Sequence, residues 1–201
     1  MRNVCLVMAV LGSIAVGTAA ADEVLEQIDA GKAYYAAGDL ARAVTELEFA
    51  LNTLRTRFSD AFMATLPAPP ALWSAEEPAQ ESAAAIFGAG VMVTRRYLEE
   101  KGDGQITAEL LIDSPVVQAL SAMFSSPVLI ANDPRLERVR FGRTAALLKW
   151  DADRRTGDLS VALGGRVLAR LTGRNIDDKA VLVELMKTWD LDEVGEVAGF
   201  R

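Results

Sequence analysis

The residue types that carry most enzymatic chemistry are scarce in this sequence. The chain of 201 residues contains no histidine, and its single cysteine, Cys5, lies in an apolar run near the N-terminus. Triads with histidine, cysteine nucleophiles, histidine zinc sites and haem ligation by histidine all need those side chains. The motifs that cradle phosphates or surround a nucleophilic serine are also missing. We therefore expect a protein that is not an enzyme and that uses no cofactor or metal.

Carboxylates are the remaining groups that could do chemistry or bind a hard cation. In the segment WDADRRTGD, Asp151, Asp153 and Asp158 could offer oxygen ligands to calcium. Their spacing does not match a helix–loop–helix calcium site and two arginines interrupt them, so we interpret the segment as a polar turn. Asp103 in KGDG has the same interpretation. A carboxylate-dependent hydrolase, the third of our functional hypotheses, would need a close pair of buried carboxylates.

Arginines offer a different chemistry, the binding of anions. The window 135–174 holds ten basic and four acidic residues, although the whole chain has a net charge of −7. Alternation in the segment LERVRFG turns Arg138 and Arg140 away from the apolar face of a strand. The register that we predict for the hairpin of residues 159–173 turns Arg170 to the same side. We predict an anion-binding group of Arg138, Arg140 and Arg170, the alternative being an ordinary solvent-facing side of a sheet. The acidic balance of the chain disfavours nucleic-acid binding.

Strands that would position these arginines are predicted by a period of two in the apolar residues. Six segments show it, at residues 91–100, 105–113, 136–142, 145–151, 159–163 and 167–173. The last two should form a hairpin. A three-residue loop, Gly164 to Arg166, pairs Leu163 with Val167 and keeps one face apolar, whereas a two-residue loop would place leucines opposite arginines. We predict the three-residue loop.

Two helices are expected to pack on this antiparallel sheet, which makes residues 86–201 an α+β domain with about six strands. One helix begins at Asp113-Ser114-Pro115 and the other covers residues 178–190. The apolar stripe of the second is Val181, Leu182, Leu185, Met186 and Trp189. The order of elements resembles the fold of the PsbP-like extrinsic photosystem proteins, a resemblance of fold that implies no function.

Residues 22–64 have a helical period that breaks at Gly38-Asp39, which predicts two antiparallel helices joined by a short turn. Within residues 24–57 the spacing of seven residues is that of one tetratricopeptide repeat: Gly31, Tyr34, Gly38, Leu40, Ala43, Leu47 and Ala50. The segment therefore resembles a single repeat of that family. Residues 65–85 contain four prolines and are predicted to be a linker.

The resemblance implies a surface for a protein partner. In tetratricopeptide arrays the first helix of each repeat lines a peptide-binding groove, and here that helix would present Leu25, Ile28, Lys32 and Tyr35. A single repeat cannot bury its apolar face alone. The hairpin must therefore dock on its own domain, on a second copy of itself, or on another protein, and the sequence leaves these three alternatives open.

The N-terminus has the pattern of a secretory signal peptide, residues 1–21. Arg2 precedes an apolar run over residues 4–16, and small residues up to Ala21 precede Asp22. The run is shorter than the roughly 20 apolar residues of a membrane span. We expect cleavage near Ala21 and a periplasmic or secreted protein without an integral membrane span.

These observations favour an exported, non-enzymatic interaction or accessory protein. Its partner would be a protein of the cell envelope or a second copy of the chain. The alternative is a carrier or sensor that holds a small lipid or anionic ligand in the α+β domain.

Overall fold

The computed structural model describes residues 19–81, 90–115, 117 and 133–200. The chain divides into two compact units, residues 1–54 and 55–201, and each is described by itself. The predicted signal peptide lies almost entirely outside the described residues. The same holds for most of the helix predicted after Pro115, including its apolar residues Val116, Leu120, Met123 and Phe124.

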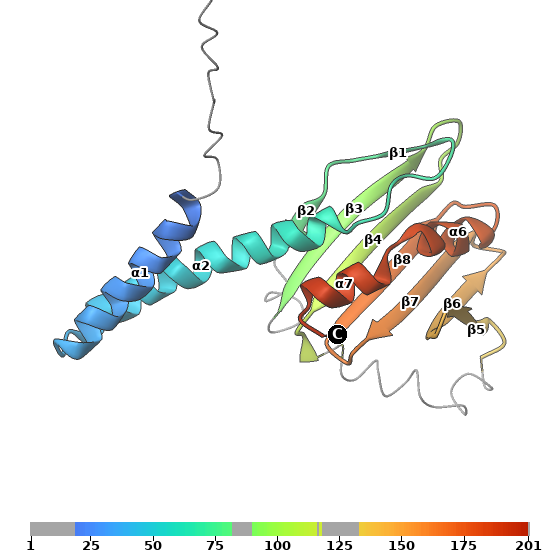
Figure 1. Cartoon of the computed structure of the whole chain (residues 1–201). Helices are drawn as coiled ribbons and strands as arrows, with labels where there is room; N and C mark the ends of the chain where they lie inside the picture. Colours follow the sequence, from blue (N-terminus) through green and yellow to red (C-terminus); the bar gives the residue numbers. More distant parts are fainter. Residues whose placement is uncertain (1–18, 82–89, 116, 118–132, 201) are drawn as a thin grey trace, which may run out of the picture. The chain divides into compact units, whose positions relative to one another are not determined.

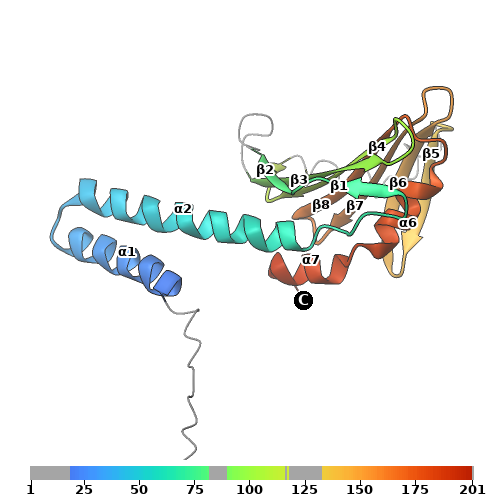
Figure 2. The ribbon, with the colours of Figure 1, turned by 90° about the horizontal axis from the view of Figure 1, so that it is seen from above.

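The first unit is a helical hairpin. Its helices are α1 (Ala19–Ala36) and the N-terminal part of α2 (Leu40–Ala64) (Figure 2). Gly38 has a φ of 79°, the left-handed conformation that ends a helix at low cost for glycine. The Asp39 carboxylate then accepts a hydrogen bond of 3.2 Å from the backbone N–H of Arg42 and caps α2. The predicted helix pair and its turn are confirmed.

Small residues bring the two helices of the hairpin close together. Gly31, Ala43 and Ala50 are buried. A Cβ atom added to Gly31 would lie 2.8 Å from Cγ of Leu47, so α1 can approach α2 only because this residue has no side chain. Tyr34 lies beside this contact, 5.6 Å from the guanidinium of Arg42. The hairpin thus packs through a narrow stripe of small residues.

The second unit is built on an antiparallel sheet of eight strands (Figure 1). The strands are β1 (Trp73–Ala75), β2 (Ala79–Glu81), β3 (Val91–Glu99), β4 (Gln105–Ile112), β5 (Leu136–Phe141), β6 (Thr144–Asp151), β7 (Thr156–Leu163) and β8 (Val167–Arg174). Their order is β1-β3-β4-β8-β7-β6-β5, and β2 also pairs with β3. The α+β class is confirmed.

The sheet is larger than predicted, and the two additional strands correct our interpretation of residues 65–85. We assigned this segment to a linker, but it contains β1 and β2, and both strands pair with β3. Each is only three residues long, too short for a period of two to be recognised in the sequence. Trp73 in β1 is half-buried and packs against the core of the second unit.

The predicted register of the β7–β8 hairpin is confirmed. Leu163 pairs with Val167 and Leu159 with Leu171, which places leucine and valine side chains on one face. The loop between them is Gly164 to Arg166, and both of its glycines have a positive φ, 55° and 69°. Arg170 consequently points to the opposite, polar face of the sheet, beside Ser160 on β7.

Two C-terminal helices cover the apolar face of the sheet, α6 (Ala180–Thr188) and α7 (Leu191–Val197) (Figure 2). The predicted stripe of α6 is confirmed, because Leu182, Leu185 and Met186 are buried against β7 and β8. The helix α7 was not predicted. Its first turn is capped by Asp190, whose carboxylate accepts hydrogen bonds from the backbone N–H groups of Asp192 and Glu193.

Candidate functional site

Exposed apolar side chains are concentrated on the helical hairpin. Of the ten large apolar residues that are exposed within the described residues, only Leu72 lies outside the segment from Leu25 to Leu54. Surface apolar residues are common singly, but a contiguous group on one element marks an interaction surface. The hairpin is therefore the leading candidate site in the described part of the chain.

The predicted partner-binding residues of α1 are exposed. Leu25 is 59% and Tyr35 68% accessible, and Ile28 and Lys32 are also exposed. Because a helix turns about 100° per residue, these four side chains lie on one side of the stripe of Val24, Gly31 and Tyr34 that packs on α2. Their exposure agrees with the prediction, and their binding of a partner stays a prediction.

A second set of exposed apolar residues lies on α2, and the sequence analysis did not select it. Its members are separated by alternating steps of four and three residues, which places them on one side of the helix: Leu40, Val44, Leu47, Leu51 and Leu54. This spacing was visible in the sequence. The tetratricopeptide resemblance implies a binding surface on the first helix alone, so these residues of α2 were not predicted.

The stripes of α1 and α2 face the same way. Viewed along each helix from its own N-terminus, the exposed stripe lies on the same rotational side of the small residues that form the hairpin contact. The two helices run in opposite directions and face the contact from opposite sides, and these two reversals cancel. Both stripes therefore point to one broad side of the hairpin. We call this surface the hairpin face, formed by Leu25, Ile28 and Tyr35 of α1 and the five residues of α2. The other side carries polar and small residues and one large apolar side chain, Phe49.

Charged residues border the hairpin face on both helices. Lys32 lies on the face of α1 between Leu25 and Ile28, whereas Asp29 on α1 and Glu48 on α2 lie at its outer edges. All three are exposed, and none makes an ion pair with another described residue. The arrangement is a mostly apolar surface with two acidic edges, which suits packing against another pair of amphipathic helices.

The three arginines predicted to bind an anion share one face of the sheet but do not form one site. Arg138 and Arg140 lie on β5 and Arg170 lies on β8, with β6 and β7 between them. Three strand spacings of about 4.8 Å separate Arg170 from Arg138 by roughly 14 Å. The sequence identified the common face correctly, but strand order, which it does not reveal, keeps these side chains apart.

Arg170 is also engaged by carboxylates of its own domain. Its guanidinium donates to Asp158, and a carboxylate oxygen of Glu109 lies 3.7 Å from it. Asp158 in turn accepts a hydrogen bond of 2.7 Å from the hydroxyl of Ser160. Burial raises the pKa of the Glu109 carboxyl, and the neighbouring Arg170 partly offsets that effect. We interpret this group as a structural ion network rather than as an anion site.

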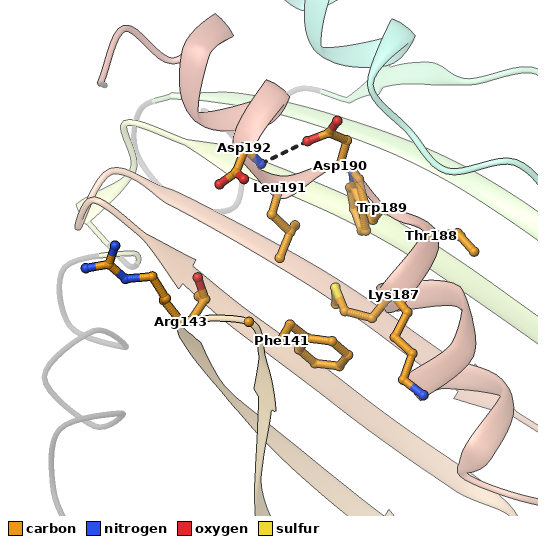
Figure 3. Close-up of a pocket in the computed structure, with 11 residues that line it drawn as sticks. Phe141, Arg143, Lys187, Thr188, Trp189, Asp190, Leu191 and Asp192 are labelled. Carbon is orange, nitrogen blue, oxygen red and sulfur yellow. Dashed lines mark hydrogen bonds between the residues drawn. The ribbon is translucent and has the colours of Figure 1, made fainter.

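A cleft in the second unit is the other candidate site (Figure 3). It has a volume of about 670 Å³ and lies between the β5–β6 turn and the junction of α6 and α7. Its apolar walls come from Phe141, Met186 and Leu191, and its charged groups are Arg143, Lys187, Asp190 and Asp192. The volume falls in the range of small-molecule sites, but the lining is about equally polar and apolar and carries both signs of charge.

One buried polar group at this cleft has no partner in the described part of the chain, and one arginine beside it is exposed to solvent. Trp189 is 3% exposed, and its indole Nε1 has no hydrogen-bond partner among the residues that the structure describes. Arg143, in the two-residue turn with Gly142, forms no ion pair with a described residue. Lys187, by contrast, pairs with Glu184 at 2.7 Å. No sequence pattern could have joined residues 141–144 to residues 186–192, since they meet only in the folded domain.

Two of the three aspartates that could have offered ligands to calcium have structural partners. Asp151 accepts a hydrogen bond from the backbone of Arg154, and Asp158 belongs to the network around Arg170. Within the described residues, no three histidine, cysteine or acidic side chains are close enough to hold a metal ion. In the same part of the chain no helix combines the length and the apolar character that crossing a membrane requires.

Comparisons with known proteins give no further guide to identity. The sequence matches no protein-family model, and no curated protein and no solved structure is significantly similar to it. The two candidate sites therefore carry what the structure indicates about function.

Proposed function

We propose that this chain is an exported, non-catalytic interaction protein and that the hairpin face binds a helical protein partner. The observation that carries the proposal is the concentration of exposed apolar side chains on α1 and α2. Burying a leucine-sized side chain that was in water contributes about 1.5–3 kcal/mol of favourable free energy. Eight such side chains on one surface favour a covered state.

The face is too broad for a chance arrangement of surface residues. Its eight large apolar side chains are each 37–68% exposed, whereas the exposed apolar residues of a monomer are usually scattered singly. The tetratricopeptide-like spacing supports the same proposal, because repeats of that family bury such faces against neighbouring helices. Export is supported by the signal-peptide pattern of residues 1–21.

The proposed binding surface can be tested by photo-crosslinking in intact cells. A photoreactive phenylalanine analogue is placed at Tyr35 or Val44, on the hairpin face, or at Phe49, on the opposite side of α2. We expect one discrete crosslinked protein species from the first two positions and none from Phe49, which is equally apolar and also exposed. Equal crosslinking from all three positions, or none from any, would contradict the proposal.

Export has its own test. In fractionated cells we expect the protein in the periplasm or the medium, with a mature N-terminus at Asp22. A full-length protein confined to the cytoplasm would contradict export. It would not contradict the binding of a partner through the hairpin face.

A second candidate function, the binding of a small amphipathic anion, is favoured by the cleft at Trp189. An apolar chain would contact Phe141 and Leu191, and its carboxylate would lie near Arg143. Octanoate is a suitable probe, with Trp189 fluorescence read in a variant that carries Trp73→Phe and Trp150→Phe. We expect saturable quenching that Arg143→Ala weakens and Arg140→Ala, on the neighbouring strand, does not. Quenching that is unsaturable or equal in both variants would exclude this site.

A further inference from the structure

A cleft on the polar face of the sheet lies apart from both candidate sites. It has a volume of about 350 Å³ and is lined by side chains of three neighbouring strands, β3, β4 and β8 (Figure 1). Thr107 on β4 and Thr172 on β8 line it, whereas their chain neighbours Ile106, Ala108 and Leu171 are buried in the core. Because side chains alternate between the faces of a sheet, this cleft lies on the face away from the core. We call it the β4–β8 cleft.

The register of β4 and β8 places four side chains of this cleft in one compact block. Gln105 pairs with Arg174, and Thr107 pairs with Thr172. Residues directly opposite each other in an antiparallel pair have Cβ atoms about 5 Å apart, and diagonal neighbours are about 7–8 Å apart. The four side chains are therefore close enough to contact one small ligand together.

The polar groups of this block have no partner in the described part of the chain. The exposed Arg174 forms no ion pair with a described residue. The hydroxyls of Thr107 and Thr172 and the carboxamide of Gln105 make no hydrogen bond to one either. A guanidinium, two hydroxyls and an amide group can thus all donate into one cleft. Such a set of free donors indicates a ligand that accepts hydrogen bonds.

The charge of the cleft favours an anion. Its lining contains three arginines and, among the described residues, one acidic side chain, Glu109, although the chain has a net charge of −7. Two of the arginines already have carboxylate partners. Arg96 lies 2.8 Å from Glu76, and Arg170 lies 3.7 Å from Glu109. Arg174 is the arginine of the cleft that is left to pair with a ligand.

A phosphate group is the anion that this donor set fits best. A guanidinium donates two parallel hydrogen bonds to a pair of oxygens, and it binds both carboxylates and phosphates in this way. A planar carboxylate has only those two oxygens. The tetrahedral phosphate group has a third oxygen outside their plane, which can accept from the hydroxyls of Thr107 and Thr172 on the neighbouring positions of the block.

We propose that the β4–β8 cleft binds a phosphate group, held by Arg174 together with Gln105, Thr107 and Thr172. This inference is independent of the proposed function, because it concerns the second unit and not the hairpin face. The volume of the cleft lies at the lower end of the range of small-molecule pockets, so a small phosphate ester fits as well as free phosphate.

Titration of the mature full-length protein with inorganic phosphate tests the site, with amide NMR signals recorded at constant ionic strength. We expect saturable shifts centred on Thr107, Thr172 and Arg174. Arg174→Gln should weaken binding at least about tenfold, because the charged two-donor group is lost. Thr172→Val keeps the shape of the side chain without its hydroxyl and should weaken binding about fivefold. Arg140→Gln is the matched control and should leave binding unchanged. Arg140 lies on the same face and forms no ion pair with a described residue, but it lies opposite Ala145.

Shifts that do not saturate, or equal weakening by Arg174→Gln and Arg140→Gln, would overturn the site, because general screening of charge has those effects. Acetate that binds as tightly as phosphate would overturn the choice of a tetrahedral anion. Glycerol 3-phosphate separates the two sources of the phosphate group. Tighter binding than inorganic phosphate supports a phosphate ester as the ligand, and weaker binding supports free phosphate.

Discussion

Single residues in the second unit show how buried polar groups are satisfied. The Tyr97 hydroxyl donates a hydrogen bond of 2.6 Å to the carbonyl oxygen of Pro67, and the ring is fully buried. Burial raises the pKa of Tyr97 to about 12, although the nearby Arg95 opposes the shift. The interaction ties the segment after α2 to strand β3.

Tyr97 should make the stability of the second unit sensitive to high pH. An unfolded tyrosine loses its proton near pH 10, whereas folded Tyr97 keeps it until about pH 12. Since the folded state then holds the extra proton, the free energy of unfolding should fall by about 1.4 kcal/mol per pH unit between these values. Urea denaturation at several pH values measures this slope. Tyr97→Phe should reduce it and cost about 1 kcal/mol at neutral pH through the lost hydrogen bond; an unchanged slope would contradict the assignment.

Arg170 supplies the cation of the ion network on the polar face of the sheet. Arg170→Gln leaves Asp158 and the half-buried Glu109 without their cation, and we expect a loss of about 1–2 kcal/mol in the free energy of unfolding. The matched control is Arg174→Gln, on the same strand and face, which pairs with no described residue and should cost less than about 0.5 kcal/mol. Chemical denaturation compares the two. Similar losses in the free energy of unfolding would mean that the ion network does not stabilise the fold.

The hairpin element depends on close approach of its helices. A Cβ atom at Gly31 would lie 2.8 Å from Cγ of Leu47, so Gly31→Val must displace the Leu47 side chain or move α1 and α2 apart. We expect this change to cost about 1–3 kcal/mol. Ala33→Val, at an exposed position of the same helix, carries the same penalty of a β-branched side chain in a helix and should cost less than about 1 kcal/mol.

Helical circular dichroism during thermal unfolding separates these two variants. The prediction fails if Gly31→Val and Ala33→Val melt together. That result would show that the helices are not held by the contact at Gly31.

The whole chain has two compact units with different sources of stability. The sheet of the second unit buries its own core between the strands and helices α6 and α7. The first unit has few buried residues of its own: Val24, Gly31, Ala43 and Ala50 are small or of modest size. A hairpin with so little core needs a partner surface for stability.

Calorimetry should therefore show two transitions. We expect the hairpin transition at the lower temperature, because the hairpin buries much less apolar surface than the second unit. A single transition, or a hairpin that unfolds after the second unit, would contradict this order.

Local patterns in the sequence determined much of this protein. The helical break at Gly38, the stripe of α6 and the register at Gly164 all follow from short-range periodicity, since a side chain's face is set by its position within one element. The exposure of Leu25 and Tyr35, in contrast, was implied by the resemblance to a tetratricopeptide repeat.

Only the tertiary structure decided which elements lie beside each other. Strand order separated Arg170 from Arg138 and placed it beside Glu109, although both arginines share a face. The pairing of β1 and β2 with β3, and the cleft that joins Phe141 to Trp189, also bring together residues distant in the chain. The physical reason is that periodicity reports the direction of a side chain within its own element, whereas its neighbours depend on how all the elements pack together.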